Sequence, residues 1–289
     1  MNTEVSQLKE DAFVFECEGE ELVAIINNGN DKTGVLVVVG GPQYRVGSHR
    51  QFTLLARKLA GNDVPVMRFD YRGMGDSTGK LRDFEDVSHD ITEAINQFYG
   101  RQPDLEKIVL WGLCDAASAA LFYAHQDERI AGLVLLNPWV RTQESLNETH
   151  IKNYYSRRIM DINFWKTFFK GKLKFSSIRA FSRDLLFWLW NKIKKAFSSR
   201  HGGDGQDQSL PGKMLSGLKN FKGKILLVIS EQDLTADEFL RVSDNPEWQN
   251  EFERCQVKKV FIEDANHTFS TQAWRNQVEQ ATLDWVKQL

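Results

Sequence analysis

The sequence predicts an α/β domain in which helices cover both faces of a mostly parallel, doubly wound sheet. Three observations lead to this fold class. Continuous apolar runs of strand length alternate with helical patterns along most of the chain. The chain has 289 residues, of which 42% are hydrophobic, and this is enough for one large core. One long stretch, residues 140–220, breaks the alternation, and we expect a helical cap insertion there.

The first expected elements are two antiparallel strands, because Phe13–Glu16 and Glu21–Ile26 flank a Glu-Gly-Glu turn. Val35–Val39 follows as a β-branched run, typical of a strand buried on both faces. The same pattern predicts strands at Val66–Phe69, Ile108–Trp111, Leu133–Leu136, Ile225–Ile229 and Lys259–Ile262. Helical patterns cover about 50–60, 84–98, 116–124 and 271–287. We therefore expect residues 1–139 and 221–289 to form the core domain and residues 140–220 to form its cap.

Cys114 lies where the strand Ile108–Trp111 passes into a helix. Gly112 and Ala116, two positions before and after it, are small, as a strained strand-to-helix turn requires. Such a turn projects the side chain at its apex away from both elements. A thiol there suits an acyl-transferring nucleophile, because cysteine becomes reactive beside a histidine or at a helix N-terminus. The alternative is a small buried cysteine at a strand end.

Asp233 and His267 each follow one of the later predicted strands, so the order along the chain is nucleophile, acid, histidine. The carboxyl ends of parallel strands share one edge of a sheet, where ligands bind. His267 would draw the proton from Cys114 and later protonate the leaving group, while Asp233 orients the imidazole. Asp237 and Asp264 are rival acids, although Asp264 can simply shape the histidine loop and Asp237 resembles the first turn of a helix.

The negative charge that develops on a carbonyl oxygen needs two N–H donors. The backbone N–H of Asp115, just after the nucleophile, is one predicted donor. The other comes from the loop after Val35–Val39, where Pro42 has no N–H, so Gly41 or Gln43 supplies it. We predict Gly41, Gln43 and Asp115 as substrate-binding residues.

Two further segments near these loops carry weaker signals. Residues 73–77, Gly-Met-Gly-Asp-Ser, lack the spacing of a phosphate or dinucleotide loop, so a structural loop that supports the site is the better interpretation. His49 follows the loop that carries Gln43, and it either faces the pocket or is a polar residue at a helix N-terminus.

Composition excludes several classes of function. The three cysteines, Cys17, Cys114 and Cys255, are widely separated, and no Cys-x-x-Cys spacing suggests metal or redox chemistry. We therefore expect no cofactor, no metal and a reduced, cytoplasmic setting. The N-terminus does not resemble a secretion signal, and no apolar run is long enough to span a membrane. The net charge of −2 argues against nucleic acid as a partner.

Residues 152–200 differ in charge from the rest of the chain. They hold 13 Lys or Arg against 2 Asp or Glu, together with 12 aromatic residues. A helical lid over the Cys114 pocket is one interpretation, which we favour because the aromatic residues then have a cavity to cover. The other is an interfacial surface drawn to anionic lipid, which would place the protein at the periphery of the inner membrane. The acidic remainder of the chain would repel single-stranded nucleic acid.

On these residues the chain resembles the α/β-hydrolase superfamily over residues 13–139 and 221–289. The stretch Phe69–Ser77 is similar to its strand-and-turn signature, and Gly112–Ala116 is similar to its nucleophile elbow, although glycine is commoner than Ala116 at that position. More narrowly, Gly40–His49 together with Gly112–Asp115 resembles the first of two hydrolase families associated with exosortase A systems. This resemblance implies a cytoplasmic hydrolase encoded beside exopolysaccharide and protein-sorting machinery, and it implies no substrate.

The sequence thus predicts a Cys-His-Asp hydrolase that cleaves a small-molecule ester or thioester through a thioacyl-enzyme. A thioacyl group also passes to acceptors other than water, so an acyltransferase that uses the same residues is the first alternative. A non-catalytic scaffold that docks at the membrane through residues 152–200 is the second.

Overall fold

The structure is a computed structural model that describes residues 10–41, 43–140 and 209–289. In these residues eight strands form one sheet in the order β1-β2-β4-β3-β5-β6-β7-β8. Only β2 runs antiparallel to its neighbours β1 and β4, and every other pair is parallel. The fold class predicted from the sequence is therefore confirmed. The strands are β1 (Glu10–Cys17), β2 (Glu20–Asn27), β3 (Thr33–Val38), β4 (Val66–Phe69), β5 (Lys107–Leu113), β6 (Ile130–Leu136), β7 (Lys224–Ser230) and β8 (Lys258–Ile262).

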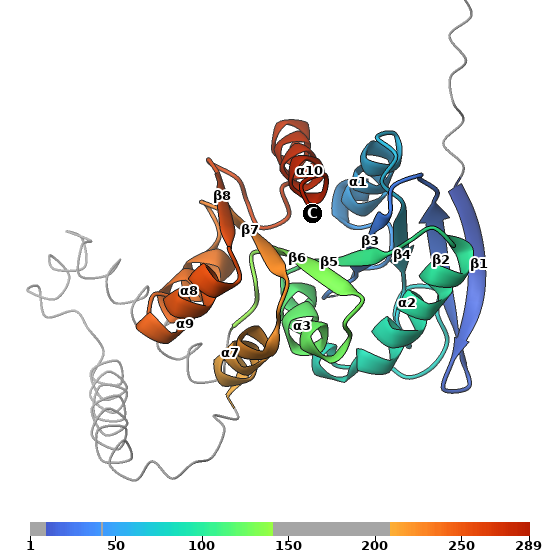
Figure 1. Ribbon diagram of the computed structural model, residues 1–289, viewed down its shortest axis with the longest axis horizontal. Coiled ribbons are helices and arrows are strands. Elements are labelled where there is room, and N and C mark those ends of the chain that lie inside the picture. The colour runs from blue at the N-terminus through green and yellow to red at the C-terminus, as the bar shows by residue number, and fades with distance from the viewer. Residues whose placement is uncertain (1–9, 42, 141–208) are drawn as a thin grey trace, which may run out of the picture. The chain divides into compact units, whose positions relative to one another are not determined.

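Helices cover both faces of the sheet (Figure 1). On one face lie α1 (Gln51–Ala60) and α10 (Gln272–Val286). On the other lie α2 (Ser88–Arg101), α3 (Asp115–Tyr123), α7 (Leu210–Asn220), α8 (Leu234–Ser243) and α9 (Pro246–Arg254). Three short 3-10 turns, η1 (Ser48–Arg50), η2 (Phe84–Asp86) and η3 (Ala124–Gln126), adjoin these helices.

Two hydrophobic clusters, one on each face, explain why the strands read as continuous apolar runs. In β3, Val35 and Val37 pack into the cluster with α1 and α10, whereas Leu36 and Val38 pack into the cluster on the other face. Successive side chains of a strand point to opposite faces, so a sheet covered on both sides needs apolar residues at every position.

Two helical features differ from the sequence-based expectation. The predicted helix at 84–98 is interrupted at Val87, which separates η2 from α2 and buries its side chain in the core. Helix α9 was not predicted. It begins after Asn245, whose side chain accepts the N–H groups of Glu247 and Trp248 as an N-cap.

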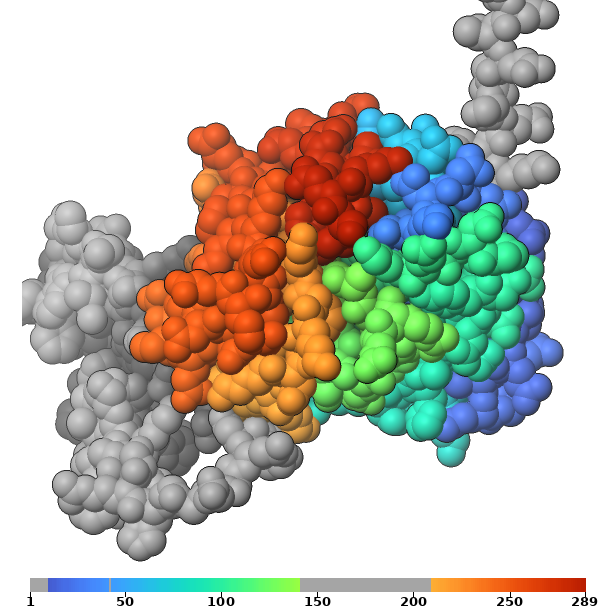
Figure 2. Space-filling view, viewed as in Figure 1, coloured from blue at the N-terminus to red at the C-terminus, as the bar shows by residue number. Residues whose placement is uncertain are grey.

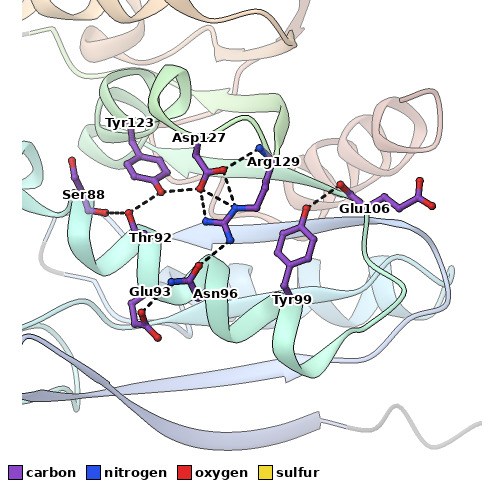
Figure 3. Close-up of polar contacts among 9 residues, drawn as sticks. All are labelled: Ser88, Thr92, Glu93, Asn96, Tyr99, Glu106, Tyr123, Asp127 and Arg129. Atoms are coloured by element: carbon purple, nitrogen blue, oxygen red, sulfur yellow. Dashed lines mark hydrogen bonds and ion pairs between the residues drawn. The ribbon is translucent and has the colours of Figure 1, made fainter.

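A polar network fastens α2 to α3 and to the start of β6 (Figure 3). The hydroxyl of Tyr123 lies 2.8 Å from Thr92 Oγ1 and 3.1 Å from Asp127 Oδ2. Arg129 forms an ion pair with Asp127 and donates to Asn96 Oδ1 at 2.9 Å. These contacts fix the helix that follows the elbow against its neighbour.

The chain divides into two compact units, residues 1–140 with 210–289 and residues 141–209. The elements above belong to the first unit, and the second lies outside the described residues apart from Ser209. Residues 210–220, at the end of the predicted cap, form α7, which lies beside α3 and α9 (Figures 1 and 2). The approach to α3 is close, since a Cβ atom on Gly217 would lie 2.2 Å from the Leu121 carbonyl oxygen. The division into core and cap stays a prediction.

Candidate functional site

Cys114 forms the apex of a sharp turn between β5 and α3. Its φ of 63° and ψ of −123° lie in a region that non-glycine residues rarely occupy, at a cost of about 1–3 kcal/mol. A Cβ atom on Gly112 would lie 2.6 Å from the backbone carbon and oxygen of Ala116, so only glycine fits there. The predicted strand-to-helix turn is thus present, with Cys114 half-buried at its apex.

The structure brings Asp233 and His267 together at the carboxyl edge of the sheet. Asp233 Oδ2 lies 2.8 Å from His267 Nδ1. The Asp233 carboxylate also caps α8, where it accepts the backbone N–H groups of Thr235 at 3.3 Å and Ala236 at 3.2 Å. These bonds orient the carboxylate. Of the three candidate acids, Asp233 is the one that contacts the histidine.

The Cys114 side chain is the second group that acts on the imidazole of His267. The bond to Asp233 and then the interaction with Cys114 raise the pKa of His267 from 6.5 to about 10, against the lowering effect of burial. The histidine therefore holds its proton at neutral pH.

Gly41 and Gln43 lie in the loop after β3, and Asp115 lies directly after Cys114. The Asp115 side chain joins this loop to the elbow by hydrogen bonds. Asp115 Oδ2 accepts the backbone N–H of Gly41 at 2.8 Å, and Oδ1 accepts that of Ala116 at 2.9 Å. Burial raises the pKa of Asp115, and these bonds partly offset the shift. The Gly41 N–H therefore already has a hydrogen-bond acceptor. Among the described residues no acceptor takes the backbone N–H of Gln43, whose side-chain Oε1 accepts from Ser48 N at 3.1 Å.

The loop that carries Gln43 is held by a buried ion pair. Asp70 is fully buried and accepts both the backbone N–H of Arg45, at 2.6 Å, and its guanidinium group. Gly75 packs directly on Asp70, because a Cβ atom there would lie 2.2 Å from Oδ2. The Gly-Met-Gly-Asp-Ser segment therefore supports the site as a structural loop. His49 is exposed, with a left-handed φ of 53°.

Sequence reasoning missed Asn137, which follows β6. Its side chain is fully buried, and Nδ2 donates to the His267 carbonyl oxygen at 3.1 Å. The only signal in the sequence was an asparagine that precedes a proline at the end of a predicted strand. Its partner could not be identified without the fold.

One hollow in the described part of the chain is bordered by Gln51, Leu55, Trp111, Phe269, Arg275, Val278 and Glu279, and none of the predicted site residues lines it. Within residues 10–41, 43–140 and 209–289, no three His, Cys, Asp or Glu side chains form a group that could hold a metal ion. No helix in these ranges has the length and apolar character needed to cross a bilayer.

Comparisons with known proteins identify the family and the fold. A family model described as serine aminopeptidase, S33, matches residues 31–179. No curated protein matches the chain. The esterase Pf2001 of Pyrococcus furiosus superposes with a TM-score of 0.63 at 17% identity, over 97% of this chain and 91% of the other.

Two further solved structures are similar in fold. Est1E from Butyrivibrio proteoclasticus, solved with ferulic acid bound, has a TM-score of 0.60 at 15% identity and covers 96% of this chain and 98% of its own. A dienelactone hydrolase from Anabaena variabilis has a TM-score of 0.59 at 15% identity, with 97% of each chain covered. At these identities the likeness establishes the α/β-hydrolase fold.

Proposed function

Because the chain belongs to the serine aminopeptidase S33 family of hydrolases, we propose that it is a hydrolase that cleaves a small ester or thioester through Cys114. Asp233, His267 and Cys114 would act as acid, base and nucleophile. The observation that carries the proposal is the hydrogen bond between the Asp233 carboxylate and the His267 ring, whose pKa the thiol at the elbow also raises. The family is serine-based, so the cysteine nucleophile is a departure from it.

The reaction begins with attack of the Cys114 thiolate on the substrate carbonyl carbon. A carbon–sulfur bond forms and the carbonyl electron pair moves onto oxygen, where the N–H groups of Asp115 and Gln43 would stabilise it. Collapse breaks the bond to the leaving group, which takes the proton of His267. Water then gives a proton to His267 and adds to the thioacyl carbon, and release of the acid restores the thiolate.

Gln43 is the better second donor. The Gly41 N–H is already bonded to the Asp115 carboxylate, whereas the Gln43 N–H lacks an acceptor within the described residues. The proposed substrate-binding set remains Gly41, Gln43 and Asp115, with Gly41 shaping the loop rather than touching the oxyanion.

Acyl transfer is a second candidate function because the apex residue is cysteine. A thioester is activated toward alcohols and amines as well as water, so one enzyme intermediate can serve both reactions. Product analysis with an alcohol or an amine in excess separates them, since a transferase forms the new ester or amide faster than it forms the free acid.

We also propose a place within the exosortase-associated hydrolases, type 1, and a cytoplasmic location. The resemblance rests on Gly40–His49 and Gly112–Asp115, and the bond between Gly41 and Asp115 joins these two segments in space. Residues 152–200, for which peripheral membrane contact or a lid was expected, lie outside the described residues. Liposome co-sedimentation of the intact chain, compared with a chain that lacks 152–200, tests the membrane interpretation and the scaffold alternative.

The primary test is intact-mass analysis after brief incubation with a panel of activated esters and thioesters. Wild type should gain the mass of one acyl group, Cys114→Ala should gain none, and His267→Ala should gain it slowly. Cys255→Ala is the matched control, because Cys255 is buried at the C-terminal end of α9 and its replacement should leave the adduct unchanged. An adduct of equal size and rate on Cys114→Ala would remove Cys114 from the nucleophile role.

A further inference from the structure

The segment between Leu136 and Trp139 holds the backbone of the elbow from both sides. The carbonyl oxygen of Leu136 accepts the N–H of Cys114 at 2.9 Å. The N–H of Trp139 donates to the carbonyl oxygen of Cys114 at 3.1 Å. Ser118 Oγ, one turn along α3, donates to the Trp139 carbonyl oxygen at 2.6 Å. This segment, residues 136–139, is therefore fastened to the nucleophile turn.

Asn137 extends from the same segment toward the histidine. Its Nδ2 donates to Ser230 Oγ at 2.7 Å and to the carbonyl oxygen of His267 at 3.1 Å. Its Oδ1 accepts the N–H of Ser230 at 2.9 Å. Ser230 is the last residue of β7, so the amide reaches from the end of β6, over the end of β7, to the loop after β8. Strand β7 separates β6 from β8, and hence no ladder hydrogen bond joins these two strands.

The backbone at Asn137 is strained. Its φ is 42°, in the left-handed region, and a proline follows it. Residues in such conformations cost about 1–3 kcal/mol, and they persist where the surrounding contacts determine them. Asparagine tolerates this region better than most residues do. The side chain is fully buried, and every hydrogen bond that it makes joins strand ends at the site edge.

We propose that Asn137 is a positioning residue that sets the separation between Cys114 and His267, by tying the carbonyl of His267 to the segment that holds Cys114. The inference rests on the proposed function of these two residues. A shift of the His267 backbone moves its ring relative to both Asp233 and the thiol, and reaction rates fall steeply with misplacement of about 1 Å. Asn137 itself touches neither substrate nor the reacting atoms.

Alkylation of Cys114 by iodoacetate, followed by peptide mass analysis from about pH 5 to about pH 11, tests the proposal without a substrate. Iodoacetate is an anion, so the protonated imidazole assists its reaction with the thiolate. The alkylation rate therefore falls at high pH when His267 loses its proton, and this fall is the alkaline limb of the profile. In the wild type we expect this limb near pH 10. His267→Ala should lack it.

Asn137→Gly removes the amide while it tolerates the left-handed backbone. A weaker bond from His267 to Asp233 and a weaker interaction with Cys114 should move the alkaline limb down by about one pH unit or more. With an ester substrate kcat should fall about tenfold and KM should stay within about twofold. Ser230→Ala is the matched control, since it removes Oγ as an acceptor for Asn137 but leaves the bond to the His267 carbonyl, and its alkaline limb should match the wild type.

Asn137→Asp is the second variant, should the glycine variant fail to fold. It keeps an oxygen for the Ser230 N–H and removes the donor to the His267 carbonyl. An added carboxylate would by its charge alone raise the pKa of His267. A fall in the pH of the alkaline limb can therefore come only from displacement of the His267 ring. An alkaline limb unchanged or raised in Asn137→Gly, or a wild-type kcat in Asn137→Asp, would overturn the proposal. A wild-type profile in His267→Ala would instead overturn the proposed function.

Discussion

Substitution of Gly112 by alanine tests the geometry of the elbow. The added Cβ would lie 2.6 Å from the backbone carbon and oxygen of Ala116 and 2.7 Å from the nitrogen of Ala117. Ordinary contact begins at 3.4 Å, so the first turn of α3 must retreat by the difference, about 0.8 Å. Overpacking of this kind costs about 1–3 kcal/mol of unfolding free energy. The same displacement of Cys114 should slow its acylation by about tenfold to a hundredfold.

The assay pairs urea unfolding with the burst of p-nitrophenol release from an activated ester. Gly100→Ala is the matched control, because Gly100 lies in α2 and an added Cβ would meet no atom of another element within 4 Å. Alanine at that helical position should stabilise the protein by about 0.4–1 kcal/mol and leave the burst rate unchanged. If Gly112→Ala unfolds and reacts as the wild type does, the close contact between β5 and α3 is not what positions Cys114.

Three further predictions concern charged groups of the site. Asp233→Asn removes the largest cause of the raised pKa of His267, so the alkaline limb of the Cys114 alkylation profile should fall from about 10 toward 6.5. An unmoved limb would exclude Asp233 as the acid. The raised pKa also stabilises the folded state fully below pH 6.5, and this stabilisation should be lost as pH rises from 6.5 to about 10. Unfolding free energies of wild type and His267→Ala, compared across that range, should converge, and a constant difference would contradict the linkage. Asp115→Ala leaves the half-buried N–H of Gly41 without its acceptor and should cost about 1–3 kcal/mol of unfolding free energy, whereas Asp115→Asn keeps one oxygen and should cost less. Equal losses in urea unfolding would show that the bond to Gly41 contributes little.

The sheet and the elbow could be predicted because each depends on a local pattern. Buried parallel strands require continuous apolar runs, as at Val35–Val39, and the turn at Cys114 requires small residues at fixed positions. The pairing of Asp233 with His267 followed from the shared edge of parallel strands. These inferences need only the order of elements along the chain.

The role of Asn137 could not be predicted, because it depends on the convergence of three strand ends and on one left-handed backbone angle. The hydrogen bond from the Gly41 N–H to the Asp115 carboxylate could not be predicted either, since side-chain conformation decides which N–H groups remain without an acceptor. In both cases the decisive partner lies more than 70 positions away in the sequence. Local pattern carries no information about such a contact.

The cysteine at the elbow and the raised pKa of His267 belong to one arrangement. A serine nucleophile needs a neutral histidine to receive its proton. Asp233 and then Cys114 raise the pKa of His267 to about 10, and the contribution of Cys114 to this shift is lost when the nucleophile is serine. A thiolate needs no base to take its proton, and an imidazolium beside it supplies the acid that the leaving group requires. Cys114→Ser should therefore fold normally and form an acyl-enzyme more slowly than the wild type at neutral pH, as followed by intact mass, because a hydroxyl group must give up its proton to His267 in the attack. Acylation at the wild-type rate would contradict this reasoning.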